Sequence, residues 1–70
     1  MRISARNQLK GKVVDLKEGA VNSKVTIELP GGERITSIIT IDSVKELGLE
    51  IGKDAFAIVK ASNVMIGVDE

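Results

Sequence analysis

Five side chains spread along this 70-residue sequence share one property, which is that each can donate hydrogen bonds: Ser4, Arg6, Thr40, Ser43 and Lys60. Arg6 and Lys60 are also cations. A cluster of such groups would suit a small dianion that has no proton of its own to donate. The five residues lie far apart in the sequence, so only the fold can bring them together.

A site made only of donors would select among anions by their protonation. Molybdate, tungstate and sulfate carry no proton at neutral pH, whereas hydrogen phosphate carries one that needs an acceptor. Leaving a buried polar group without a partner costs about 1–3 kcal/mol. A donor-only site should therefore disfavour phosphate, while separation of molybdate from sulfate would depend on the size of the site.

Each of these residues also has an ordinary structural interpretation. Ser43 is typical of a helix cap, and Thr40 of a β-strand. Lys60 could be a surface lysine whose aliphatic stem lies along apolar residues. Ser4 and Arg6 could belong to an exposed strand face. The anion hypothesis therefore depends on the elements that position these side chains.

The hydrophobic pattern predicts three strands, a short helix and two further strands. We expect strands at residues 4–16, 20–29, 33–40, 55–61 and 64–68, and the helix at 41–47. This order is that of the OB-fold, an all-β, five-stranded Greek-key barrel with one short helix between strands 3 and 4. A generic small β-sandwich is the alternative. Either way, we expect residues 1–70 to form a single domain.

Local signals support these boundaries. In the second strand, alternation predicts an inner face of Val21, Val25, Ile27 and Leu29. Lys17-Glu18-Gly19 and Pro30-Gly31-Gly32 supply turns before the second and third strands. The helix could be capped by Ser43 in a capping box with Glu46, or instead by Thr40 or Asp42, and Gly48 is the expected stop signal.

The last two predicted strands are apolar on both faces. Phe56 and Ile58 alternate with Ala55, Ala57 and Val59, and Val64, Ile66 and Val68 alternate with Met65. Strands of this kind are covered on both sides, but a chain of this size has only one interior. The sequence contains no cysteine or histidine, which removes disulfides and the usual metal sites as stabilising devices. We therefore expect a homo-oligomer.

The composition argues against several classes of function. The net charge is zero and Phe56 is the single aromatic residue, which disfavours nucleic-acid binding. Without histidine or cysteine, and without a nucleophile motif, the sequence does not indicate an enzyme. No segment has the length and hydropathy of a signal peptide or a membrane span. These features predict a cytoplasmic protein with no membrane partner and no organic cofactor.

Three segments resemble sequence motifs of the molbindin family of molybdate-binding proteins. They are Ile3-Ser4-Ala5-Arg6-Asn7-Gln8-Leu9-Lys10-Gly11, Thr36-Ser37-Ile38-Ile39-Thr40-Ile41-Asp42-Ser43-Val44 and Ala57-Ile58-Val59-Lys60-Ala61-Ser62. The motifs occur in family order, and the resemblance covers essentially the whole chain. It implies an OB-like fold, a hexamer built as a trimer of dimers, and molybdate or tungstate bound at subunit interfaces.

Carried over by position, the resemblance implies a ligand set of side chains and backbone groups: Ser4, Ala5, Arg6, Thr40, Ser43, Lys60 and Ala61. Ala5 and Ala61 would contribute backbone atoms. We expect the site to join Ser4 and Arg6 of one region with Thr40, Ser43 and Lys60 of another. A free-standing chain of this kind resembles family members that store and buffer molybdate. The competing hypotheses are an OB-type nucleic-acid-binding module and a purely structural assembly module.

Overall fold

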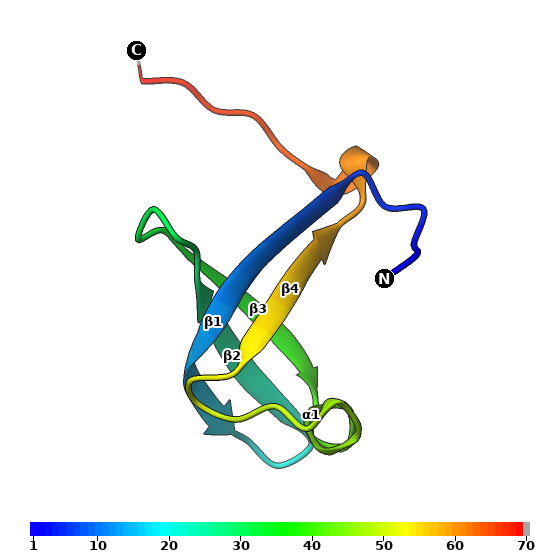
Figure 1. The fold of residues 1–70 in the computed structure, drawn as a ribbon, viewed down its shortest axis with the longest axis vertical. Helices are drawn as coiled ribbons and strands as arrows, with labels where there is room; N and C mark the ends of the chain where they lie inside the picture. The colour runs from blue at the N-terminus through cyan, green and yellow to red at the C-terminus, as the bar shows by residue number, and fades with distance from the viewer. Residues whose placement is uncertain (70) are drawn as a thin grey trace.

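A curled antiparallel sheet and one short helix make up the protein, as shown by a computed structural model that describes residues 1–69 (Figure 1). The elements are β1 (Asn7–Glu18), β2 (Asn22–Glu28), β3 (Arg34–Thr40), α1 (Ile41–Leu47), β4 (Asp54–Val59) and a 3-10 turn, η1 (Ala61–Asn63). The strand order is β3-β2-β1-β4, and all neighbours are antiparallel. The predicted all-β class, with a helix between the third and fourth strands, is confirmed.

The prediction of a fifth strand at residues 64–68 is wrong for this chain on its own. Within the described residues, this segment pairs with no strand and leads away from the sheet (Figure 1). Its apolar, β-branched residues have the composition of a strand, but a strand forms only when a partner edge accepts its hydrogen bonds. The sheet therefore has four strands, and β3 and β4 form its edges.

Two predicted strand starts also differ from the structure. β1 begins at Asn7, so Ser4 and Arg6 precede the strand and do not share a strand face. β2 begins at Asn22, so Val21 lies in the preceding turn, where its side chain is exposed. The inner position expected for an apolar residue is taken by Ser23, which is buried and donates a hydrogen bond from Oγ to the Lys17 carbonyl, at 3.3 Å. That bond makes burial of the hydroxyl tolerable.

The buried core is small. Val13, Val25, Ile27 and Val44 are its buried apolar residues, so the inner faces of β1 and β2 and one residue of α1 meet there. The second apolar face of β4 is confirmed, because Ala55 and Ala57 pack against the core while Phe56 and Ile58 are exposed. Among residues 1–69, no helix has the length and apolar character needed to cross a membrane.

Helix α1 is fixed at both ends by local hydrogen bonds. Thr40 is the N-cap, with Oγ1 accepting a hydrogen bond from the Ser43 amide at 3.0 Å. Of the three candidate caps, the structure therefore selects Thr40. Gly48 ends the helix with a left-handed backbone (φ 63°), and its amide donates to carbonyls of the last turn. The predicted stop at Gly48 is confirmed, and it depends on the ease with which glycine adopts positive φ.

Removing the cap should destabilise the protein measurably. We expect Thr40→Ala to lower the free energy of unfolding by about 1 kcal/mol, because one helix amide loses its acceptor. Thr40→Ser should retain most of the stability, because serine can accept the same bond. Urea unfolding at a fixed protein concentration measures both effects. Equal losses in the two variants would contradict the capping role.

The pairing of β1 with β4 carries an exposed charge cluster. Lys12 donates from Nζ to Asp54 Oδ1 at 2.8 Å, and Lys10 Nζ lies 3.7 Å from Asp54 Oδ2. The hydrogen bond from Lys12, followed by the positive charges of Lys12 and Lys10, lowers the pKa of Asp54. A carboxylate with a depressed pKa stabilises the fold above the pKa that it has in the unfolded chain.

That stabilisation should disappear in acid. As the pH falls below about 4, where an unfolded aspartate takes up its proton, the stability difference between the wild type and Asp54→Asn should shrink toward zero. At neutral pH the variant should be slightly less stable, since exposed ion pairs contribute little. Urea midpoints measured between neutral pH and pH 3 test this, with Asp15→Asn as a comparison at a residue that forms no ion pair among residues 1–69. A stability difference that is independent of pH would contradict the ion-pair assignment.

Candidate functional site

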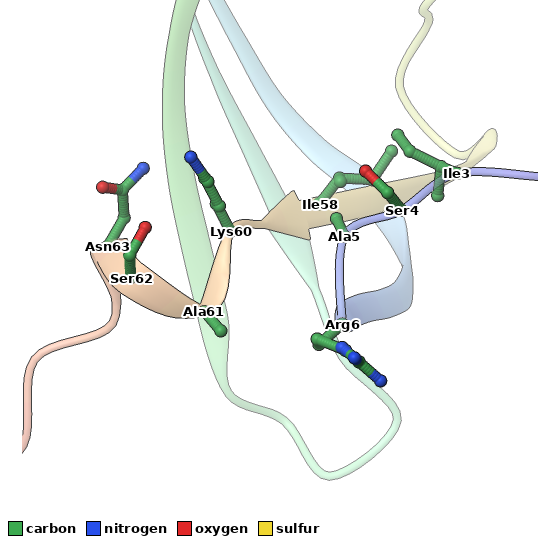
Figure 2. Close-up of a pocket in the computed structure, with 9 residues that line it drawn as sticks. All are labelled: Ile3, Ser4, Ala5, Arg6, Ile58, Lys60, Ala61, Ser62 and Asn63. Carbon is green, nitrogen blue, oxygen red and sulfur yellow. The ribbon is translucent and has the colours of Figure 1, made fainter.

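A shallow pocket of about 620 Å³ lies at the end of the sheet where β1 begins and β4 ends (Figure 2). Two segments line it, the N-terminal segment before β1 and the segment from the end of β4 through η1. The lining residues are Ile3, Ser4, Ala5, Arg6, Ile58, Lys60, Ala61, Ser62 and Asn63. Five of the seven predicted ligand residues are among them. The pocket therefore joins the first and third of the sequence motifs.

The antiparallel ladder between β1 and β4 brings these two segments together. Asn7, the first residue of β1, is paired with Val59, the last residue of β4. The Asn7 side chain also donates from Nδ2 to the Val59 carbonyl at 3.1 Å, and Gln8 donates from Nε2 to the Ala5 carbonyl at 3.1 Å. The Asn7 bond holds the start of β1 against the end of β4, beside Lys60, and the Gln8 bond ties the N-terminal segment to β1.

The turn η1 adds backbone donors at the same place. Lys60 is its N-cap residue, and the Asn63 amide donates to the Lys60 carbonyl at 2.8 Å. The amides at the start of such a turn have no acceptor within it. The amide of Ala61, the first residue of the turn, is therefore available to a ligand, which is compatible with the backbone role predicted for Ala61.

The polar side chains in the pocket do not all point the same way. Figure 2 shows the ends of Ser4, Lys60, Ser62 and Asn63 extending to one side, whereas the Arg6 guanidinium extends to the other. Ser62 and Asn63 are not among the predicted ligands, because the sequence pattern favours a connection between two strands at these positions. The end of the third motif at Ser62 is the one sequence signal for them.

The electrostatic character of this pocket is positive. Neither Arg6 nor Lys60 forms a salt bridge within the described part of the chain, whereas Lys10, Lys12, Arg34 and Lys53 all do. No aspartate or glutamate lines the pocket. Two cations, the Ser4 hydroxyl and the backbone amide of Ala61 are therefore free to bind an anion.

Thr40 and Ser43 lie at the opposite end of the molecule. Thr40 ends β3 and is paired with Asn22 at the start of β2, beside the far end of β1. The 12-residue strand β1 runs between this end and the pocket, and 12 extended residues cover at most roughly 40 Å at about 3.3 Å per residue. Figure 1 shows the separation, with α1 at one end of the sheet and η1 at the other.

The expected grouping of Lys60 with Thr40 and Ser43 is therefore wrong within one chain. Lys60 lies with Ser4 and Arg6, because β4 runs antiparallel to β1 and ends beside its start. At the far end, Thr40 donates from Oγ1 to Ser43 Oγ at 2.9 Å while accepting from the Ser43 amide. The Ser43 hydroxyl proton is thus left to donate outward, and Thr40 orients it.

Comparisons with known proteins agree on one family. The TOBE domain family matches residues 3–66. A molybdenum-pterin-binding protein of Clostridium pasteurianum is 59% identical over 94% of this chain and 97% of its own length. The probable molybdenum-pterin-binding protein of Haemophilus influenzae is 55% identical over 99% of this chain and all of its own.

Solved structures show the same fold. MopII of Clostridium pasteurianum superposes with a TM-score of 0.90 at 57% identity, over 96% of this chain and 100% of its own. The cytoplasmic molybdate-binding protein ModG, with molybdate bound, gives a TM-score of 0.94 at 52% identity, over 99% of this chain and 49% of its own. A molybdate-binding protein of Sporomusa ovata gives 0.90 at 35% identity, over 97% of this chain and 100% of its own.

Proposed function

Because this chain belongs to the TOBE domain family, and its relatives are molybdenum-pterin-binding and molybdate-binding proteins, we propose that it binds molybdate reversibly. One observation supports the proposal above the others. Lys60 and Arg6 carry positive charges that no described carboxylate neutralises, and they line a pocket together with donor groups. Tungstate, with the same charge and no proton at neutral pH, is the expected second ligand.

The complete site is proposed to form between copies of the chain. One copy would supply Ser4, Arg6 and Lys60, with backbone groups of Ala5 and Ala61, and another would supply Thr40 and Ser43. The distance between the two ends supports this division, because one chain cannot bring both sets to the same ion. Exposed apolar side chains such as Ile38, Phe56 and Ile58 support self-association. We propose a homo-hexamer built as a trimer of dimers.

The ligand is proposed to be the inorganic oxyanion without an organic cofactor. No aromatic side chain lines the pocket, so a pterin ring would have no surface on which to stack. The donors would hold the ion by charge and hydrogen bonds and would perform no chemistry on it. The proposed role is therefore storage and buffering of molybdate in the cytoplasm, and not catalysis.

Calorimetric titration of the purified protein with molybdate, tungstate, sulfate and phosphate tests the proposal. We expect molybdate and tungstate to bind, and phosphate to bind at least about tenfold more weakly, because its proton meets no acceptor. Absence of binding heat with molybdate, or tighter binding of phosphate, would overturn the proposal. Millimolar binding to an oligomer that is the same with and without oxyanion would favour an assembly module. A salt-sensitive gel shift would favour a nucleic-acid module.

A further inference from the structure

Asn63 carries the one carboxamide among the described residues that line the pocket. Its backbone is fixed beside Lys60, because the Asn63 amide donates to the Lys60 carbonyl at 2.8 Å. Its side chain is exposed and forms no hydrogen bond with another residue of the chain between residues 1 and 69. A polar side chain on a fixed backbone, with no partner in its own chain, is available to a ligand.

The donor end of this carboxamide faces the same side of the pocket as Lys60. Figure 2 shows the side chains of Asn63, Lys60 and Ser4 extending to one side, with the Asn63 nitrogen toward Lys60 and its oxygen away from it. The amide nitrogen and the lysine ammonium group are both donors. No carboxylate among the described residues lines the pocket to accept from them. A tetrahedral oxyanion, which offers several acceptor oxygens, would accept from both residues.

The neutrality of Asn63 preserves the positive charge of the pocket. Arg6 and Lys60 supply two cations, which match the charge of a dianion. Aspartate has nearly the same shape as asparagine, but when ionised it is negative and only accepts hydrogen bonds. At position 63 an aspartate would attract the Lys60 ammonium group and repel the ion. Asparagine therefore leaves Lys60 to the ligand.

We propose that Asn63 is a specificity-determining residue of the anion site, which donates a hydrogen bond from its side chain to the bound oxyanion. The inference rests on the proposed function, because it requires that the pocket binds an oxyanion. It concerns the choice between anions. An ion without a proton needs donors, whereas hydrogen phosphate carries an O–H group that a carboxylate would accept. A donor at position 63 therefore favours molybdate, and an acceptor there would favour hydrogen phosphate.

Asn63→Asp tests the proposal with almost no change of shape. We expect molybdate, tungstate and sulfate to bind about tenfold more weakly, because a donor is lost and a charge of the same sign faces the ion. Hydrogen phosphate should lose much less, because the carboxylate accepts its proton. The preference for molybdate over phosphate should therefore fall by about tenfold, while the preference for molybdate over sulfate stays the same. Calorimetric titrations at mildly alkaline pH, where phosphate keeps one proton, measure all four anions.

Two further variants separate the contact from the change of charge. Lys24→Gln is the matched control, because it lowers the net charge by the same amount at an exposed residue of β2 outside the pocket. It should bind all four anions like the wild type. Asn63→Ala removes the donor without adding a charge, so it should weaken all four anions alike and less than Asn63→Asp weakens molybdate. Sedimentation equilibrium shows whether the variants compared have the same mass.

Nuclear magnetic resonance of the wild type gives a readout that does not depend on the stability of a variant. The side-chain amide signals of Asn63, identified by their absence from the spectrum of Asn63→Ala, should shift when molybdate is added. A purely structural role for Asn63 would leave these signals in place, because its side chain would not contact the ion.

Failure of this proposal can be told apart from failure of the proposed function. Molybdate binding that is equal in Asn63→Asp and the wild type would overturn the role of Asn63 and leave the ligand assignment intact. The same conclusion would follow from an equal loss in Lys24→Gln, or from Asn63 signals that do not shift. A wild-type protein that gives no binding heat with molybdate would overturn both proposals.

Discussion

Lys60→Ala is expected to weaken molybdate binding by about 10- to 100-fold. Lys60 is one of two cations in the pocket, and no carboxylate of the described residues pairs with it. A hydrogen bond to a charged group contributes about 1.5–3 kcal/mol, and each 1.4 kcal/mol corresponds to a tenfold change in affinity. Calorimetric titration of the variant with molybdate measures the loss directly.

Two further variants separate a specific contact from a general change of charge. Lys24→Ala removes the same charge from an exposed residue of β2 and should bind molybdate like the wild type. Lys60→Arg keeps the charge but changes the shape of the donor, and should lie between the two. Sedimentation must show the same mass for all variants. Unchanged binding in Lys60→Ala, or an equal loss in Lys24→Ala, would show that the pocket is not the site.

Gly11→Ala should lower the free energy of unfolding by about 2–3 kcal/mol, the upper part of the range for overpacking a close-packed interior. A Cβ at this position would lie 2.6 Å from the Glu28 carbonyl oxygen and 3.0 Å from its carbon. Both are backbone atoms of the neighbouring strand, so β1 and β2 would have to move apart. Gly11 is also buried, which leaves no direction in which the methyl group could be accommodated.

Gly31→Ala is the matched control for this effect. Its Cβ would approach the Glu33 carboxylate, which can move because it is the end of a flexible side chain. We expect a change of no more than about 0.5 kcal/mol there. Urea unfolding should be compared at one protein concentration, because assembly contributes to apparent stability. Similar losses in the two variants would contradict the close approach of β1 and β2 at Gly11.

Local features of the sequence predicted most of the fold. The inward positions of Val25 and Ile27 in β2, the Pro30-Gly31-Gly32 turn and the stop at Gly48 each depend on a few neighbouring residues, and the structure confirms them. Local features do not determine whether residues 64–68 form a fifth strand. Residues 64–68 have the composition of a strand, but whether they form one depends on a partner edge, which is not a property of the segment itself.

For the site, too, the sequence predicts the types of residue but not how the fold groups them. Residue types and motifs are sufficient to predict donors at five positions, which are Ser4, Arg6, Thr40, Ser43 and Lys60. Their grouping requires the register of β1 with β4, which places Lys60 beside the N-terminal segment. The roles of Thr40 and Ser43 also depend on geometry, because only the hydrogen bonds show which hydroxyl keeps a proton to donate.

Because the donors lie at opposite ends of the chain, the fraction of sites that hold an ion would depend on the concentration of the protein. In the proposed arrangement an isolated subunit holds an incomplete set at each end, so diluting the protein would release the ion even when the free ion concentration is unchanged. Mass action then links the two equilibria, and bound ion would in turn hold the copies together. The amount of molybdate bound would therefore rise more steeply than in proportion to the protein concentration. Synthesis of the chain would itself control the concentration of free molybdate.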